Sequence, residues 1–160
     1  MEISVLIDQG VVAPFSVDRL RGIVEQVLTS ENPGSFVELG LVIADQDKIR
    51  WLNRDYRGRD EPTDVLAFSA MEETGPEFPP FVPPPDGVQH LGEVIISYPQ
   101  AVMQAEERRH PVEQEIAILI IHGVLHLLGY QHDEPERERQ MRAREAEILS
   151  SIRVDLYETD

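Results

Sequence analysis

The sequence predicts a single domain of the α/β or α+β class. Short apolar segments with strand character alternate with amphipathic helical segments, and the C-terminal third is helical throughout. The length of 160 residues suits one domain, and a hydrophobic content of 41% is ordinary for a folded protein. We therefore expect one domain over residues 1–160 with a sizeable core.

The expected strands are short runs rich in apolar and β-branched residues, at 3–8, 36–44, 64–69 and 92–97. Between the first two, a helix is expected over 16–30, with Ser16 as N-cap and apolar residues at helical spacing. The turn sequence Asn-Pro-Gly at 32–34 ends it. Asp45 can cap a second helix that runs to about Asp55.

Three further helices are expected in the C-terminal part. The first covers 99–109, and the second begins near Pro111, runs to about Leu128 and is apolar almost all round, which is typical of a buried helix. The third covers 134–152 and has a single apolar stripe, formed by Met141, Ile148, Leu149 and Ile152. Its many acids and arginines are interpreted as a solvated face.

Residues 71–91 hold six of the twelve prolines, four acids and no Lys or Arg. Proline lacks the amide donor that a sheet ladder needs, so we expect an exposed loop or flap. A tolerated surface insertion is the simpler interpretation, and a substrate-facing flap is the alternative.

The charge and residue usage exclude several classes of protein. With 14 Lys+Arg against 30 Asp+Glu, the net charge is −16, which argues against broad non-specific nucleic-acid binding, and no DNA partner is expected. The absence of Cys excludes disulfides, thiolate metal ligands and a cysteine nucleophile. No apolar run reaches the roughly 18 residues of a membrane span, and the N-terminus does not resemble a signal peptide. A cytoplasmic protein without a membrane partner is therefore expected.

Three of the five histidines lie within one segment, His122-Gly-Val-Leu-His126-Leu-Leu-Gly129-Tyr-Gln-His132. His122 and His126 are four residues apart, so on a helix they share one face and can reach one metal ion. His132 can join them only if the chain turns back, and Gly129 permits this because glycine adopts the left-handed conformation without a Cβ penalty. A lone buried histidine is usually a hydrogen-bonded core residue, but three at this spacing are hard to explain that way.

Three imidazoles without a thiolate favour Zn²⁺, with Ni²⁺, Co²⁺ or Fe²⁺ as alternatives. Three protein ligands leave a fourth position for water, as in catalytic zinc sites, and zinc lowers the pKa of that water from about 15.7 to about 7. The segment is therefore typical of a metal-dependent hydrolase.

The spacing H-x-x-x-H-x-x-G-x-x-H is that of the metzincin peptidases. Those enzymes carry a glutamate general base directly after the first histidine, and Gly123 stands there in this chain. Glycine has no proton acceptor, so a peptidase-like hydrolase is kept only as an alternative.

Upstream of the histidine segment, residues 53–57 are N-R-D-Y-R, residues 63–68 are T-D-V-L-A-F and residues 91–97 are L-G-E-V-I-I-S. Together with the histidine segment, these blocks resemble the YbeY family of zinc-dependent endoribonucleases, over roughly residues 37 to 150. Residues 122–132 resemble the family's H-G-x-L-H-L-x-G-Y-D-H signature. Residues 53–57 and 63–68 resemble its N-x-x-Y-R and T-D-V-L-S-F block, and 91–97 resemble its L-G-D-I-x-I-S strand. The departures are Gln131 for the family's aspartate, Ala67 for its serine, and a longer proline-rich segment.

The resemblance implies one α/β domain with a small mixed sheet of about four strands, about five helices, and a metal site at the end of the buried helix. It implies one Zn²⁺ on His122, His126 and His132, and cleavage of single-stranded RNA. It also implies a role in ribosomal RNA maturation, at the 3′ end of 16S rRNA, and in ribosome quality control, with the small ribosomal subunit as partner. Arg57 matches the family's arginine and is the expected catalytic or phosphate-binding residue. The residues themselves do not identify a general base: Glu93 is a weak candidate, and a plain strand-edge carboxylate is an equal alternative for it.

The segment from Lys48 to Arg59 is locally basic, with only Asp55 as an acid; its bases are Lys48, Arg50, Arg54, Arg57 and Arg59. Arg54 and Arg59 are therefore candidate substrate-binding residues beside Arg57. A short basic strip can hold a few phosphates while the acidic remainder discourages non-specific binding. A zinc-bearing ribosome assembly factor with little catalysis is a further alternative.

Overall fold

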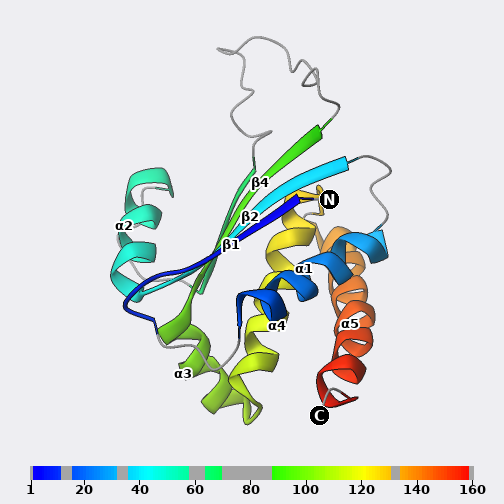
Figure 1. Cartoon of the computed structure of the whole chain (residues 1–160). Helices are drawn as coiled ribbons and strands as arrows, with labels where there is room; N and C mark the ends of the chain where they lie inside the picture. The colour runs from blue at the N-terminus through cyan, green and yellow to red at the C-terminus, as the bar shows by residue number, and fades with distance from the viewer. Residues whose placement is uncertain are drawn as a thin grey trace.

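The computed structural model describes residues 2–11, 16–31, 36–57, 64–69, 88–130 and 134–158. Within these ranges the chain forms four strands and five helices (Figure 1). In chain order they are β1 Glu2–Ile7, α1 Val17–Glu31, β2 Phe36–Ala44, α2 Gln46–Arg57, β3 Val65–Ser69, β4 Val88–Ser97, α3 Tyr98–Arg108, α4 Val112–Leu127 and α5 Pro135–Glu158. None of these helices is long and apolar enough to cross a membrane.

The four strands form one mixed sheet in the order β1-β2-β4-β3. β1, β2 and β4 are parallel, whereas β3 runs antiparallel to β4 at one edge. The sequence predictions for β1, β2 and β3 are confirmed to within a residue at each end. The α+β fold class with a four-stranded mixed sheet is confirmed as well.

β4 begins four residues earlier than the predicted strand at 92–97. The segment 88–91, VQHL, contains no proline, and it extends the ladder with β2, where Val88 aligns with Phe36 and His90 with Glu38. The prediction of a loop through residue 91 is therefore wrong at its C-terminal end. The rest of that predicted loop lies outside the described residues.

Side-chain caps begin three of the helices, as local sequence chemistry predicts. The Arg19 amide donates to Ser16 Oγ (3.1 Å) at α1, and the Lys48 amide donates to Asp45 Oδ1 (2.8 Å) at α2. Ser97 Oγ accepts from the Gln100 amide (3.3 Å) at α3.

α5 runs to Glu158, beyond the predicted end at residue 152, because no glycine or proline follows there to stop it.

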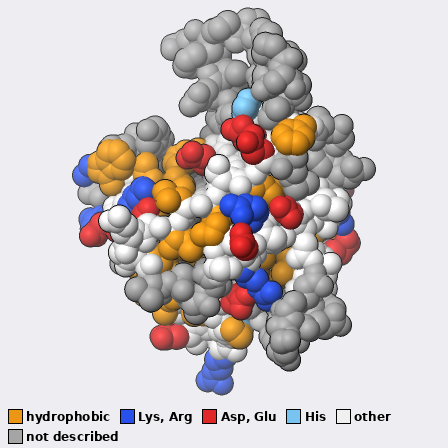
Figure 2. Space-filling model, in the orientation of Figure 1, with side chains coloured by type: hydrophobic (Ala, Val, Ile, Leu, Met, Phe, Trp, Pro, Cys, Tyr) orange, Lys and Arg blue, Asp and Glu red, His pale blue; other side chains and the backbone are white. Residues whose placement is uncertain are grey.

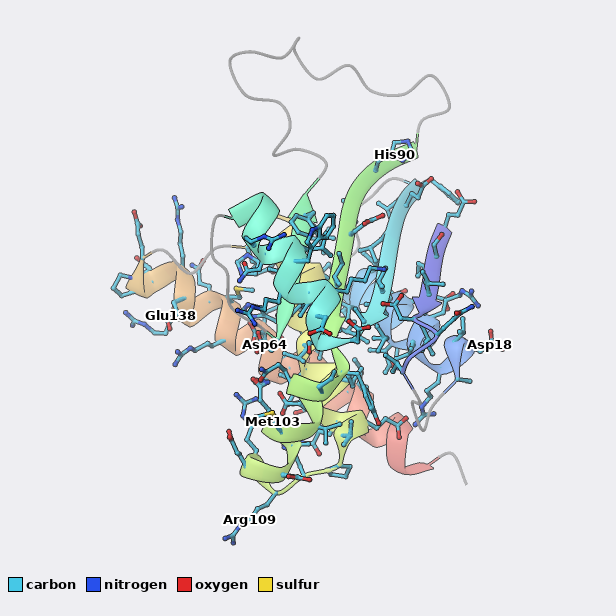
Figure 3. The ribbon with its side chains drawn as sticks, turned by 90° about the vertical axis from the view of Figure 1, so that its left-hand side faces the viewer. Asp18, Asp64, His90, Met103, Arg109 and Glu138 are labelled. Carbon is cyan, nitrogen blue, oxygen red and sulfur yellow. The ribbon has the colours of Figure 1, made fainter. Side chains whose placement is uncertain are left out.

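The sheet separates two apolar layers, because successive strand residues point to opposite faces. Val94 and Ile96 of β4 belong to the main core, with α1, α4 and α5, whereas Ile95 belongs to a smaller cluster with Ile49 of α2 and Leu66 of β3. Figure 3 shows α2 in front of the sheet, on the face opposite to α4.

α4 is the central helix of the main core, and most of its residues are buried, as its apolar sequence predicts. It packs closely on β4 at Gly123. A Cβ atom at this position would lie 2.6 Å from Val94 Cγ1, which is too close for any real contact. Gly123 is therefore required by the packing of α4 on the sheet, and this contact fixes the helix that carries the histidines.

Glu115 is the one fully buried acid of α4, and its charge is compensated. Arg108 Nη1 donates to its Oε2 (2.8 Å), Gln104 Nε2 donates to the same oxygen (3.2 Å), and His110 Nε2 lies 2.6 Å from its Oε1. Gln104 also donates to Asp64 at the start of β3 (3.3 Å), and Asp64 lies beside α3 in Figure 3. The network joins α3, α4 and β3, which gives His110 a structural role.

Candidate metal and RNA site

His122 and His126 lie side by side on α4. Their ring centroids are 4.7 Å apart, with an angle of 78° between the ring planes, and both residues are partly buried. This arrangement confirms that the two imidazoles share one helix face. Neutral imidazole is a common ligand of zinc and other first-row transition metals, so the pair has suitable donor chemistry for such an ion.

α4 ends at the glycine that the sequence indicates. Gly129 has a φ of 104°, a conformation that other residues rarely adopt. The Gly129 amide donates to the His126 carbonyl (3.1 Å), and the Tyr130 amide donates to the Leu125 carbonyl (3.0 Å). These two hydrogen bonds form a Schellman motif, which ends the helix and reverses the chain. His132 and Gln131 lie outside the described residues, so the place of the third ligand stays a prediction.

Tyr130 is held just before the segment that leads to His132. Its hydroxyl donates to Glu31 Oε2 of α1 (3.0 Å), and Arg144 Nε of α5 donates to the other oxygen of Glu31 (2.5 Å). Burial raises the pKa of Tyr130, and the hydrogen bond and charge of Glu31 raise it further. Tyr130 therefore stays protonated near neutral pH and remains a donor. This contact anchors the return of the chain between α1 and α5.

Glu145 of α5 contacts His122, and sequence reasoning missed it. Its Oε1 lies 3.0 Å from His122 Nδ1, and the side chains of Glu145 and His122 are 25% and 33% exposed. A signal was present in the sequence, because Glu145 lies four residues after Met141 and three before Ile148, within the apolar stripe of α5. The abundance of charge in this helix hid it among residues assigned to the solvated face.

The residues present fit a metal ion. Because Glu145 engages Nδ1 of His122, the Nε2 atom is the one through which this imidazole would bind a metal, an arrangement common to metal-binding histidines. In the part of the chain that the structure describes, no group of three His, Asp or Glu side chains could hold a metal ion. His132, the third predicted ligand, lies outside these ranges.

The three candidate arginines belong to or follow α2. Arg54 is exposed on this helix, and Arg57 is its last residue, although the Arg57 side chain is outside what the structure describes. Arg59 lies outside the described residues altogether. α2 and α4 cover opposite faces of the sheet, with the edge strand β3 contributing to both layers. The end of α2 therefore lies on the opposite side of the sheet from His122 and His126.

Glu93, the weak candidate for the general base, lies on the face of the sheet opposite to α4. Its side chain lies against Gly40 on the α2 side of the sheet, where a Cβ at Gly40 would be 3.3 Å from Glu93 Cγ. The next residue, Val94, points instead to α4. Glu93 is therefore directed away from His122 and His126, toward the side of the sheet that α2 covers, and its role as general base stays a prediction.

The packing at Gly123 also bears on the peptidase alternative. The position directly after His122 is pressed against Val94, so a glutamate there could not be accommodated without moving the helix. The position that bears the general base in metzincin peptidases therefore faces the core of this protein.

Comparison with known proteins identifies the family. The family model described as "Endoribonuclease YbeY" matches residues 11–153. The chain belongs to the YbeY endoribonuclease family. The match extends further toward the N-terminus than the three motif blocks do, and it includes α1 and β2.

Two relatives named Endoribonuclease YbeY illustrate the extent of the similarity. One from Dehalococcoides mccartyi is 44% identical over 158 residues, which cover 96% of this chain and 98% of the relative. One from Roseiflexus sp. is 41% identical over 151 residues, which cover 91% of this chain and 92% of the relative. The solution structure of TM1509 from Thermotoga maritima is 25% identical with a TM-score of 0.59, and the match covers 99% of this chain and 96% of that one. The YbeY similarity therefore spans nearly the whole chain.

Proposed function

We propose that this protein is a metal-dependent endoribonuclease that cuts single-stranded RNA. The observation that carries the proposal is the pair of imidazoles at the end of α4, supported by a carboxylate and placed just before a chain reversal. The pair occurs in a member of a family whose relatives are named endoribonucleases.

The proposed cofactor is one Zn²⁺ per chain, held by His122, His126 and His132, with Ni²⁺ or another divalent transition metal as a substitute. When bound, the ion would supply Lewis acidity toward water and toward a phosphate oxygen of the RNA. The protein's own contribution is to hold the imidazoles. α4 fixes His122 and His126, and the Gly129 turn with the Tyr130 anchor directs the chain toward His132.

Arg57 is the proposed catalytic residue, because a guanidinium can donate two parallel hydrogen bonds to a phosphate and neutralise the charge that grows there during cleavage. Arg54 and Arg59 are proposed to bind the phosphates on either side. α2 carries four basic and two acidic residues, so it is locally positive in a chain of net charge −16. The acidic remainder would limit binding to a short RNA footprint.

The biological substrate proposed is ribosomal RNA, at the 3′ end of 16S rRNA, with the small ribosomal subunit as the partner that presents it and the cytoplasm as the location. A net charge of −16 supports this view, because a protein so acidic would gain from a partner that positions the RNA strand.

The test is a cleavage assay on an end-labelled, unstructured RNA oligonucleotide. We expect internal cuts that EDTA abolishes and added Zn²⁺ restores, and none in a DNA oligonucleotide of the same sequence. Binding should weaken steeply with salt, and a salt slope near zero would contradict the proposed phosphate contacts. Ribosome binding without cleavage would favour the assembly-factor alternative, and cleavage of a peptide substrate would favour the peptidase-like one.

A further inference from the structure

The carboxylate of Glu145 is partly buried at the contact between α5 and α4, with its side chain 25% exposed. Its neighbours on the same face of α5, Met141 and Ile148, are 1% and 2% exposed, and this face packs on α4. A partly buried carboxylate is stabilised by a polar partner. The structure provides one at 3.0 Å, His122 Nδ1, on the other helix.

We propose that Glu145 is a positioning residue that holds His122 in the Nδ1–H tautomer and presents its Nε2 atom to the metal. The carboxylate can only accept, so Nδ1 must carry the proton of the neutral ring, and Nε2 is then the unprotonated nitrogen. The contact also fixes the rotation of the ring, because α5 is packed against α4. This inference rests on the proposed metal site, to which it adds a residue from a second helix.

The first experiment needs no metal. The ring ¹⁵N shifts of His122 in the metal-free protein should show the Nδ1–H tautomer in the wild type and a shift toward Nε2–H in Glu145→Ala. Glu145→Gln retains an acceptor oxygen and should keep much of the wild-type tautomer. An unchanged tautomer in Glu145→Ala would overturn the inference, whether or not the protein binds zinc.

The second experiment measures Zn²⁺ affinity by competition with a chromophoric chelator. Glu145→Ala should bind zinc about 10- to 100-fold more weakly than the wild type, with a smaller loss for Glu145→Gln. Glu147→Ala is the matched control, because Glu147 lies on the same helix, is 67% exposed and pairs with Arg144. Equal affinity in wild type and Glu145→Ala would refute the positioning role alone. Failure of the wild type to bind zinc would instead refute the metal site of the proposed function.

A separate observation concerns α2, where a large aromatic ring is exposed in a basic setting. Trp51 is 50% exposed, and the opposite side of the helix is buried through Ile49 and Asn53. Arg50 directly precedes Trp51, and Arg54 follows Trp51 by about one helical turn. Both arginines are exposed. Over α2, at the left of Figure 2, hydrophobic and basic side chains lie side by side.

We infer that Trp51 is a stacking site for one base of a single-stranded RNA, with Arg50 and Arg54 contacting its phosphates. Aromatic side chains beside positive charge are the common means of holding single strands without sequence preference. Trp51 lies six residues before Arg57, or about 9 Å along the helix axis. This inference rests on the proposed RNA substrate and names a binding subsite for it.

The chain has a single tryptophan, so its fluorescence reports on Trp51 alone. Titration with a short unstructured RNA in EDTA, which prevents cleavage, should quench this fluorescence. Trp51→Ala should weaken RNA binding roughly five- to tenfold and raise KM by a similar factor, whereas Trp51→Phe should bind nearly as the wild type does. Phe36→Ala is the matched control, because Phe36 is equally exposed at 50% but lies on β2.

Unchanged fluorescence at saturating RNA, or equal RNA affinity in Trp51→Ala and the wild type, would overturn the stacking site. If the wild type cuts RNA in either case, the proposed function stands without this subsite. If the wild type neither binds nor cuts RNA, the proposed function itself fails.

Discussion

Replacement of His126 by alanine should remove both the bound metal and RNA cleavage. His122 with one further ligand would hold a transition-metal ion much more weakly, because catalytic zinc sites use three protein ligands. We expect the zinc content of purified His126→Ala to fall from about one per chain to near zero, and cleavage to fall by about 10³-fold or more. Elemental analysis and the RNA assay on the same preparation measure both.

His90→Ala is the matched control for this loss. His90 is a histidine at the start of β4, where Figure 3 labels it, and its Nδ1 lies 3.3 Å from Glu38 on the face opposite to α4. This variant should retain zinc and activity. Stoichiometric zinc in His126→Ala, with cleavage like that of the wild type, would refute the assignment of His126 as a ligand.

The local parts of the site could be predicted from the sequence because their signals are local. The four-residue spacing of His122 and His126 places them on one helix face, and Gly129 ends the helix in a conformation that few other residues adopt. Similarly, Ser16 and Asp45 begin their helices through side-chain hydrogen bonds that span three residues. Each of these features depends on residues within one or two turns of chain.

The features that could not be predicted depend on contacts between distant segments. The start of β4 at Val88 follows from pairing with Phe36, and the face on which Glu93 lies follows from the position of β4 between β2 and β3. Glu145 is 23 residues from His122, and only the packing of α5 on α4 brings their side chains together. Hydrophobic periodicity indicates which face of an element is buried, but not which element covers it.

Replacement of Arg57 by alanine should abolish efficient cleavage while leaving the metal in place. Arg57 ends α2, on the opposite side of the sheet from α4, so its loss should not disturb the packing that holds His122 and His126. A guanidinium that stabilises charge on the transferring phosphate typically contributes about 10²- to 10³-fold or more to the rate. We therefore expect kcat to fall by that factor, with the zinc content and the thermal stability unchanged.

Two further variants separate charge from geometry and catalysis from binding. Arg57→Lys keeps the charge but loses the two parallel donors of the guanidinium, so it should recover only part of the activity. Arg54 lies one turn before Arg57 on the same helix. Arg54→Ala should raise KM with little change in kcat, because a residue that only binds a flanking phosphate stabilises the ground state and the transition state equally. If Arg57→Ala cuts RNA as the wild type does, the catalytic role of Arg57 is refuted. The metal-binding histidines would then remain as the basis of the proposed activity.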